Sequence, residues 1–163
     1  MGRTKILKFK KDDLKGLKNM LIDLKTFNDE EIKTAIEMAK EFLRKGKKSD
    51  YNFLAAKENG NLLGFLCFGP TPLTYHTFDL YWIAVSSKYQ RKSIGKMLLK
   101  KCEEEVKKEK GKILVIETSS TKKYEKARKF YKKNGFKKIA EIKNFYKPKD
   151  NKIIYIKNIK GGK

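Results

Sequence analysis

The stretch WIAVSSKYQRKSIGKMLL (residues 82–99) decides the fold. It begins with apolar residues typical of a buried strand, passes through a short polar loop and ends in a helical pattern. Such a turn directs several backbone N–H groups and the positive end of a helix dipole at one point. Arg91, Lys92 and Lys96 add side-chain charge there. Each N–H bond to a charged oxygen contributes roughly 1.5–3 kcal/mol, so the stretch predicts a pyrophosphate site.

Spacing excludes two well-known phosphate-binding loops. A Walker loop would need glycine at Gln90 and a hydroxyl residue at Met97. The three-glycine fingerprint of dinucleotide-binding folds is also absent. The loop by itself is equally consistent with an ordinary strand-to-helix turn.

Outward from this stretch, apolar periodicity and turn residues predict a mixed α/β fold. The segment 77–118 reads as strand, helix, strand, and a crossover of that kind makes its two strands parallel. Hairpins on either side are antiparallel, and the turn at 58–61 (Glu-Asn-Gly-Asn) is a strong hairpin signal. We expect a twisted, mostly antiparallel sheet of about seven strands flanked by helices on both faces. The expected strands are 6–10, 51–57, 62–68, 77–85, 112–118, 136–142 and 153–159, and the expected helices are 12–24, 28–46, 94–109 and 122–133.

The chain of 163 residues suits one domain, residues 1–163. No apolar run approaches the ~20 residues of a membrane span. Cys67 and Cys102 form neither a disulfide framework nor a metal-binding spacing, and with a single histidine zinc is not expected. These features favour a reducing cytosol and therefore a cytoplasmic protein that has no metal and no membrane partner.

The net charge is +22, from 41 basic and 19 acidic residues. Only four basic residues are arginines, whereas dedicated phosphate-binding surfaces favour arginine. The lysines are spread over every segment, which favours a solvated basic surface or a composition bias. Nucleic acid is therefore a secondary expectation as a partner.

Two motifs resemble those of the GNAT superfamily of N-acetyltransferases. The family pattern Gln/Arg-x-x-Gly-x-Gly/Ala corresponds to residues 90–95, Gln-Arg-Lys-Ser-Ile-Gly, with Ser93 at the first glycine; a serine suits that position if its φ is negative. A second pattern, Asn-x-x-Ala-x-x-x-Tyr-x-x-x-Gly-Phe, corresponds to residues 124–136, with Tyr124 in place of asparagine. Both motifs occur in order and in the expected βαβα context, and the resemblance covers residues 78–159.

The resemblance implies acetyl-CoA as the acetyl donor. In the family, the backbone of the strand before the loop binds the pantetheine arm, between two parallel strands that splay apart. The implied cofactor-binding residues are Ile83, Ala84, Val85, Gln90, Arg91, Lys92, Ser93, Ile94, Gly95, Lys96 and Tyr124.

Acetyl transfer to an amine makes three chemical demands. An amine of pKa ~10.4 must lose a proton, which a general base can take. The oxyanion needs a donor, most simply the N–H of Val85. The departing thiolate needs an acid or a hydrogen-bond donor, and the resemblance assigns that role to Tyr131. Tyr124, Ala127 and Tyr131 are spaced to share one helix face; a core aromatic is the other interpretation of Tyr131.

Three residues are candidates for the general base. Asp79 is favoured, because many family members carry a glutamate six residues before the position of Val85. Glu117 is the rival, near the carboxyl end of the next parallel strand, where α/β sheets place ligands. Either carboxylate could be an ordinary strand-end charge. His76 is the third candidate, although a turn or surface role suits it better.

The sequence thus predicts a cytoplasmic acetyl-CoA-dependent N-acetyltransferase that acts by direct attack of a primary amine, on a small molecule or a peptide. The alternative is a non-catalytic acyl-CoA-binding or RNA-contacting module on the same fold. Family members often pair, so a homodimer is compatible with this interpretation, but no residue argues for one. The acceptor is not identified by the sequence.

Overall fold

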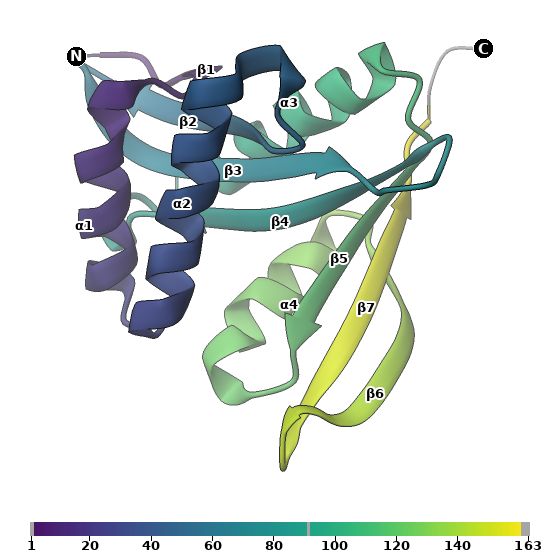
Figure 1. The fold of residues 1–163 in the computed structure, drawn as a ribbon. Coiled ribbons are helices and arrows are strands. Elements are labelled where there is room, and N and C mark those ends of the chain that lie inside the picture. Colours follow the sequence, from purple (N-terminus) through teal and green to yellow (C-terminus); the bar gives the residue numbers. More distant parts are fainter. Residues whose placement is uncertain (1, 91, 161–163) are drawn as a thin grey trace. The chain divides into compact units, whose positions relative to one another are not determined.

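The computed structural model describes residues 2–90 and 92–160 and contains one seven-stranded sheet with the order β1-β2-β3-β4-β5-β7-β6 (Figure 1). The pair β4–β5 is parallel, and the pairs β1–β2, β2–β3, β5–β7 and β6–β7 are antiparallel. The strands are β1 (Lys5–Lys8), β2 (Asn52–Glu58), β3 (Asn61–Pro70), β4 (Thr77–Val85), β5 (Ile113–Ser119), β6 (Lys137–Lys147) and β7 (Asp150–Asn158). The α-helices are α1 (Leu14–Leu24), α2 (Asp29–Lys45), α3 (Ile94–Lys108) and α4 (Glu125–Lys133).

These elements confirm the fold predicted from the sequence. The turn after β2 has Asn59 and Gly60 at φ of 52° and 79°, the left-handed pair that a tight hairpin needs. The Asn28 side chain accepts a hydrogen bond of 2.8 Å from the Glu31 N–H and caps α2 as its spacing predicts. No helix in the described part of the chain has the length and apolar character needed to cross a bilayer.

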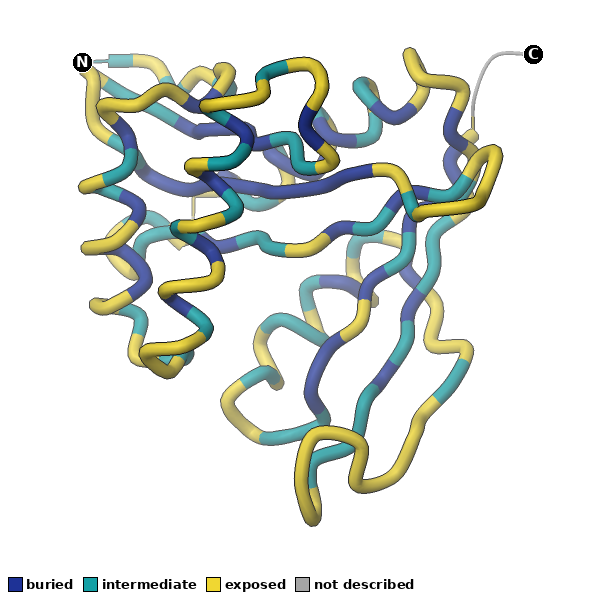
Figure 2. The backbone as a smooth tube through the Cα atoms, in the orientation of Figure 1, coloured by how far each residue is buried: buried dark blue, intermediate teal, exposed yellow. Residues whose placement is uncertain are grey.

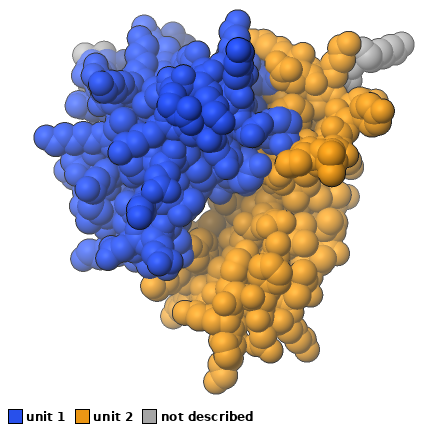
Figure 3. All heavy atoms as spheres, in the orientation of Figure 1, with its two compact units in different colours: residues 1–70, 80–105 blue, residues 71–79, 106–163 orange. Residues whose placement is uncertain are grey.

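The chain divides into two compact units, coloured separately in Figure 3. The first unit comprises residues 1–70 and 80–105. Its core joins α1 and α2, which lie side by side (Figure 1), to one face of β2 and β3, with the rings of Phe53 and Phe65 stacked at 6.0 Å. Helix α3 lies on the other face, where a Cβ at Gly64 would be 3.3 Å from Leu98 Cδ1. Strand β3 is buried from Leu63 to Gly69 because helices cover both of its faces (Figure 2).

The second unit comprises residues 71–79 and 106–163. Strand β5 pairs with β7 along its whole length, and α4 packs on this pair through the ring of Tyr131, 6.0 Å from that of Tyr155. Strand β4 contributes to this unit only through residues 77–79, which pair with residues 113–115 of β5. The remainder of β4 belongs to the first unit.

The edge strand β6 differs most from its prediction. It was expected to end at Ile142 but extends to Lys147, so the hairpin to β7 is much tighter. Its register shifts between Lys138 and Ala140 and again between Ile142 and Lys147. Such bulges have no signature in apolar alternation, and they protect an exposed edge from pairing with another chain.

Candidate functional site

In the first unit, the turn from β4 to α3 is fixed by main-chain hydrogen bonds. The Ser86 N–H donates to Leu63 O at 2.8 Å, the Tyr89 N–H to Ser86 O at 2.9 Å and the Met97 N–H to Ser93 O at 3.0 Å. Ile94 is fully buried and anchors the start of the helix. Helix geometry leaves the N–H groups of the first turn without acceptors inside the helix, and the dipole of this 15-residue helix adds positive potential there.

Two residues of this loop, Ser93 and Lys92, differ from the simplest form of the predicted site. Ser93 has a φ of 59°, so the condition under which a serine suits this position, a negative φ, is not met, and Ser93 adopts the left-handed conformation that a glycine would accept without strain. The Lys92 N–H donates to Tyr89 O at 3.2 Å, so this amide is occupied within the loop. Lys92 Nζ also lies 5.3 Å from the centre of the Tyr89 ring. Arg91, predicted to bind the cofactor, lies outside the described residues.

The end of β4 presents backbone groups next to this loop. Ala84 is buried, whereas Ile83 and Val85 are half-buried. The Gln90 Nε2 donates to Val85 O at 3.2 Å, which ties the loop to the strand. A Cβ at Gly64 would lie 2.9 Å from Ala84 O, so glycine allows β3 to approach β4 closely at this point. The backbone at Ala84 and Val85 therefore contacts both β3 and the loop within this unit.

In the second unit, Tyr131 lies in an aromatic cluster. Its side chain is buried, with ring centres 5.9 Å from both Phe130 and Phe136 and 6.0 Å from Tyr155. Burial, followed by the nearby Tyr155, raises the pKa of the Tyr131 phenol well above its usual range. The hydroxyl is therefore protonated at neutral pH, as a proton donor must be.

Register places the two carboxylate candidates on one face of the second unit. Asp79 pairs with Val115, and Glu117 lies two residues further along β5. Paired residues, and residues two apart, share a face of a sheet. Tyr155 instead pairs with Ile116, which points to the opposite face. Because Tyr131 packs on Tyr155, the donor candidate lies on the face opposite to both base candidates.

Each base candidate has a polar partner. The Thr71 Oγ1 donates to Asp79 Oδ2 at 2.8 Å. Glu117 Oε2 lies 2.8 Å from Lys152 Nζ, in an ion pair where the lysine side chain is 14% exposed. His76 Nδ1 lies 3.1 Å from Lys110 O, a contact that fixes the loop between α3 and β5 and favours the structural role expected for this histidine.

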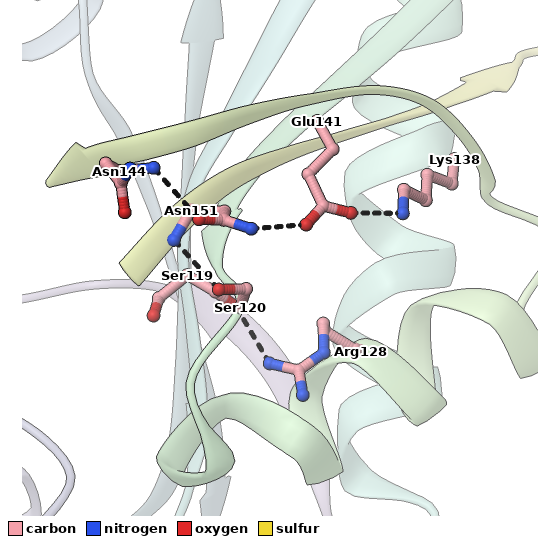
Figure 4. A network of polar contacts seen from close by, with 7 residues as sticks. All are labelled: Ser119, Ser120, Arg128, Lys138, Glu141, Asn144 and Asn151. Atoms are coloured by element: carbon pink, nitrogen blue, oxygen red, sulfur yellow. Dashed lines mark hydrogen bonds and ion pairs between the residues drawn. The ribbon is translucent and has the colours of Figure 1, made fainter. Parts of the chain in front are cut away.

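A polar network holds the turn from β5 to α4 (Figure 4). Arg128 Nη1 donates to the carbonyl oxygens of Ser119 and Thr121, both at 2.8 Å. Ser119 Oγ donates to Asp150 and accepts from the Thr121 N–H at 3.0 Å. These bonds fix the segment that leads to Tyr124, whose N–H donates to Thr121 O at 3.1 Å just before α4 begins.

The network continues into the β6–β7 hairpin through Asn151. The Asn151 N–H donates to Ser120 Oγ at 2.8 Å, and its side-chain Nδ2 donates to Glu141 Oε2 at 2.6 Å (Figure 4). The Asn144 N–H donates to Asn151 Oδ1 at 2.9 Å, and Glu141 also pairs with Lys138. Sequence reasoning missed this network. The one available signal was Arg128, the only arginine in a helix otherwise rich in lysine.

The two cysteines are not candidates for covalent chemistry. Both side chains are completely buried in the first unit. Burial is the main cause that raises the pKa of each thiol, and neighbouring groups, Cys102 for Cys67 and Glu103 for Cys102, add to it. Neither thiol forms the thiolate that a nucleophile requires.

Comparison with known proteins defines the family. Residues 49–138 match the acetyltransferase (GNAT) domain. A GNAT-family protein from Desulfovibrio desulfuricans is 34% identical, with a TM-score of 0.93 over 97% of this chain and 100% of that one. No curated protein matches the chain.

Two more distant structures share the fold. The ribosomal-protein-S18-alanine N-acetyltransferase from Escherichia coli is 20% identical, with a TM-score of 0.77 over 99% of this chain and 97% of that one. The PaiA N-acetyltransferase from Thermoplasma acidophilum, in complex with coenzyme A, is 22% identical, with a TM-score of 0.74 over 96% and 99% of the two chains. The matched domain covers more than half of the sequence, and the protein belongs to the GNAT acetyltransferase family.

Proposed function

We propose that the protein is an acetyl-CoA-dependent N-acetyltransferase that acts by direct attack of a primary amine of a small molecule or peptide. The observation that carries this proposal is the β4–α3 turn, which main-chain bonds hold in front of a 15-residue helix whose first-turn N–H groups have no acceptor inside the helix. In direct attack, the amine adds to the thioester carbonyl carbon and the thiolate then leaves from the tetrahedral intermediate, so the amine needs a base and the sulfur needs a donor. Asp79 or Glu117 is the candidate for the base, and Tyr131 is the candidate for the donor to the sulfur.

Acetyl-CoA would be held mainly by backbone groups of the first unit. The N–H groups of Ile94, Gly95 and Lys96, in the first turn of α3, are the proposed ligands of the pyrophosphate, and the Lys96 ammonium adds charge. Lys92 would contribute through its side chain, because its amide is occupied. Coenzyme A in the Thermoplasma protein and in an aminoglycoside 6'-N-acetyltransferase supports this ligand class.

Further contacts to the cofactor follow the family pattern. Residues 83–85 would bind the pantetheine arm through the strand backbone. Gln90 would contribute its side chain, and Arg91 a further charge. Tyr124 would lie near the cofactor from the start of α4. The Ser93 hydroxyl, in an exposed and left-handed position, is an additional donor at the pyrophosphate.

In the proposed reaction, each residue handles one proton or charge. A carboxylate takes a proton from the ammonium, so that the neutral amine can attack the carbonyl carbon. The Val85 N–H donates to the carbonyl oxygen as negative charge develops. When the carbon–sulfur bond breaks, Tyr131 gives its proton to the thiolate, the attacking nitrogen releases its second proton to solvent, and Tyr131 regains a proton from solvent. Asp79 is the preferred base, because the Lys152 ammonium at 2.8 Å competes with an amine for Glu117.

Two measurements test the proposal. Acetyl-CoA at about 100 times its dissociation constant should stabilise the protein by about 2.7 kcal/mol, which raises Tm by roughly 5–10 °C for a chain of this size. With a panel of amines, at least one acceptor should release free CoA above the rate of hydrolysis. A shift in Tm without release from any amine would favour an acyl-CoA-binding module, and no shift would contradict both.

A further inference from the structure

Positive charge is unevenly divided between the two units. The second unit carries 20 basic and 6 acidic residues, a net charge of +14 over 67 residues. The first carries 21 basic and 13 acidic residues, a net charge of +8 over 96 residues. Lysines are spread along the whole sequence, but the acids that would balance them are mostly in the first unit. A uniform composition bias explains the number of lysines, but it does not explain why the second unit has so few acidic residues.

The excess peaks on the outer side of α4. Nine basic residues and one acid lie between residues 122 and 138, and all eight of the lysines are exposed. Lys126, Lys129 and Lys133 are spaced i, i+3 and i+7, so they form one stripe about 10 Å long along the helix. Tyr131 lies about half a turn away from this stripe and is buried. We call Lys126, Lys129 and Lys133 the lysine stripe.

Little within the described residues neutralises the stripe. Glu125 lies 3.5 Å from Lys129 Nζ, and the side chains of this pair are 49% and 76% exposed. An ion pair as exposed as this contributes little and opens readily. The acid nearest in sequence after the stripe, Glu141, is occupied by Lys138 and Asn151. The stripe therefore presents three ammonium groups on one helix face.

We propose that the lysine stripe binds the phosphate backbone of a nucleic acid duplex, without reading its sequence. A duplex offers closely and regularly spaced phosphates, which suit a row of flexible ammonium groups. The exposed apolar side chains that follow the stripe in sequence, Ile139, Ile142, Phe145 and Tyr146, lie on β6, and α4 itself, which is described throughout, exposes no large apolar side chain. It lacks the wedge that inserts into a bilayer, the apolar anchor of a protein interface and the aromatic platform on which single strands stack.

The test compares two triple variants of equal net charge. The stripe variant is Lys126→Gln, Lys129→Gln, Lys133→Gln, and the control is Lys33→Gln, Lys40→Gln, Arg44→Gln on one face of α2, where all three side chains are exposed. Fluorescence anisotropy with a labelled 20-base-pair DNA duplex of mixed sequence is measured between 50 and 200 mM salt. Each phosphate contact contributes about 0.9 to the slope of log affinity against log salt, so the stripe variant should lose about 2.7.

We expect the stripe variant to bind at least tenfold more weakly at 50 mM salt, whereas the control keeps most of the slope and affinity. Equal losses in both variants would show a response to net charge alone and overturn the proposal. An unchanged slope in the stripe variant would overturn it as well. The proposal would also be overturned if the wild-type protein bound anionic lipid vesicles but did not bind the duplex at the same ionic strength. Melting curves of both variants confirm that they are folded.

Discussion

Two turns from a strand into a helix contain most residues of the proposed site, and they are held in different ways. The turn from β4 to α3 is fixed by main-chain bonds, such as Ser86 N–H to Leu63 O. The turn from β5 to α4 is fixed by side chains, above all the Arg128 guanidinium on two carbonyl oxygens. A turn built from main-chain bonds tolerates changes of side chain, whereas the second turn depends on particular side chains, of which Arg128 makes two of the bonds. The following predictions test this contrast.

The largest effect is expected from the side chain that the second turn positions. Tyr131→Phe removes only the hydroxyl and keeps the ring among Phe130, Phe136 and Tyr155. Loss of a general acid typically costs about 10²–10⁴-fold in rate, so kcat should fall by that order while the dissociation constant of acetyl-CoA is unchanged. Tyr155→Phe is the control in the same cluster, with kcat near that of the wild type. If Tyr131→Phe kept the wild-type kcat, Tyr131 would be a core aromatic residue with no part in the reaction.

The next largest effect is expected at the side-chain-held turn itself. Arg128→Ala leaves the carbonyl oxygens of Ser119 and Thr121 without their donor, at a cost of about 1–3 kcal/mol each. Tm should fall by at least 4 °C. The control is Arg44→Ala on the exposed surface of α2, which should change Tm by less than about 2 °C.

Activity distinguishes positioning from stability at Arg128. If the guanidinium positions α4, kcat for Arg128→Ala measured well below its Tm should fall more than KM changes, and Arg128→Lys should restore stability only in part, because one ammonium does not reproduce the planar fork. A folded Arg128→Ala protein with wild-type kcat would limit this residue to a structural role.

A smaller effect of opposite sign is expected in the loop held by the main chain. Ser93 has a φ of 59°, and a residue with a side chain pays about 1–2 kcal/mol there. Ser93→Gly should relieve part of this strain and raise the free energy of unfolding by roughly 0.5–1 kcal/mol, since glycine also loses more chain entropy. Ser87→Gly, at an exposed position of the same loop, should be neutral or destabilising. Destabilisation by Ser93→Gly would show that its hydroxyl supports the loop.

The last prediction is that ionisation of Tyr131 causes no loss of rate at alkaline pH. The pKa of Tyr131 is raised by burial, so the folded enzyme keeps its proton donor throughout the range in which amines become neutral. The rate should rise with pH and should not fall between pH 8 and about 10. A fall in that range that disappears in Tyr131→Phe would contradict this prediction.

The same raised pKa links the stability of the fold to pH. In the unfolded chain the tyrosine pKa is about 10. The stabilisation linked to this group is therefore complete below pH 10 and is lost as the pH rises above it.

The sequence predicted the first turn better than the second for a physical reason. A loop that binds with its backbone requires glycine, small residues and a following helix, and these leave a motif at residues 90–95. The network of Arg128, Ser119, Asp150 and Asn151 joins positions up to 32 residues apart in the sequence. Its members are common polar residues without fixed spacing. Only the pairing of β5 with β7 brings them together, so no local pattern could predict it.

The same reasoning explains the errors within the loop and at the sheet edge. A serine suits the first glycine position of the motif only with a negative φ, but the turn geometry imposes a positive φ and Ser93 accepts the strain. The bulges in β6 shift the register at Ala140 and Lys147, where the exposed sequence has no apolar alternation to specify the register. The candidates Asp79 and Glu117 were predicted separately, and only the register of β4 with β5 shows that they share a face.

The central claim is that the first turn of α3 holds the diphosphate of acetyl-CoA through its backbone. Hydrogen exchange of individual amides, measured with and without CoA, tests it most directly. We expect the amides of Ile94, Gly95 and Lys96 to exchange at least tenfold more slowly with CoA bound, and S-acetyl pantetheine, which lacks the diphosphate, to leave them unchanged. Protection by CoA elsewhere in the chain, with these three amides unaffected, would contradict the account.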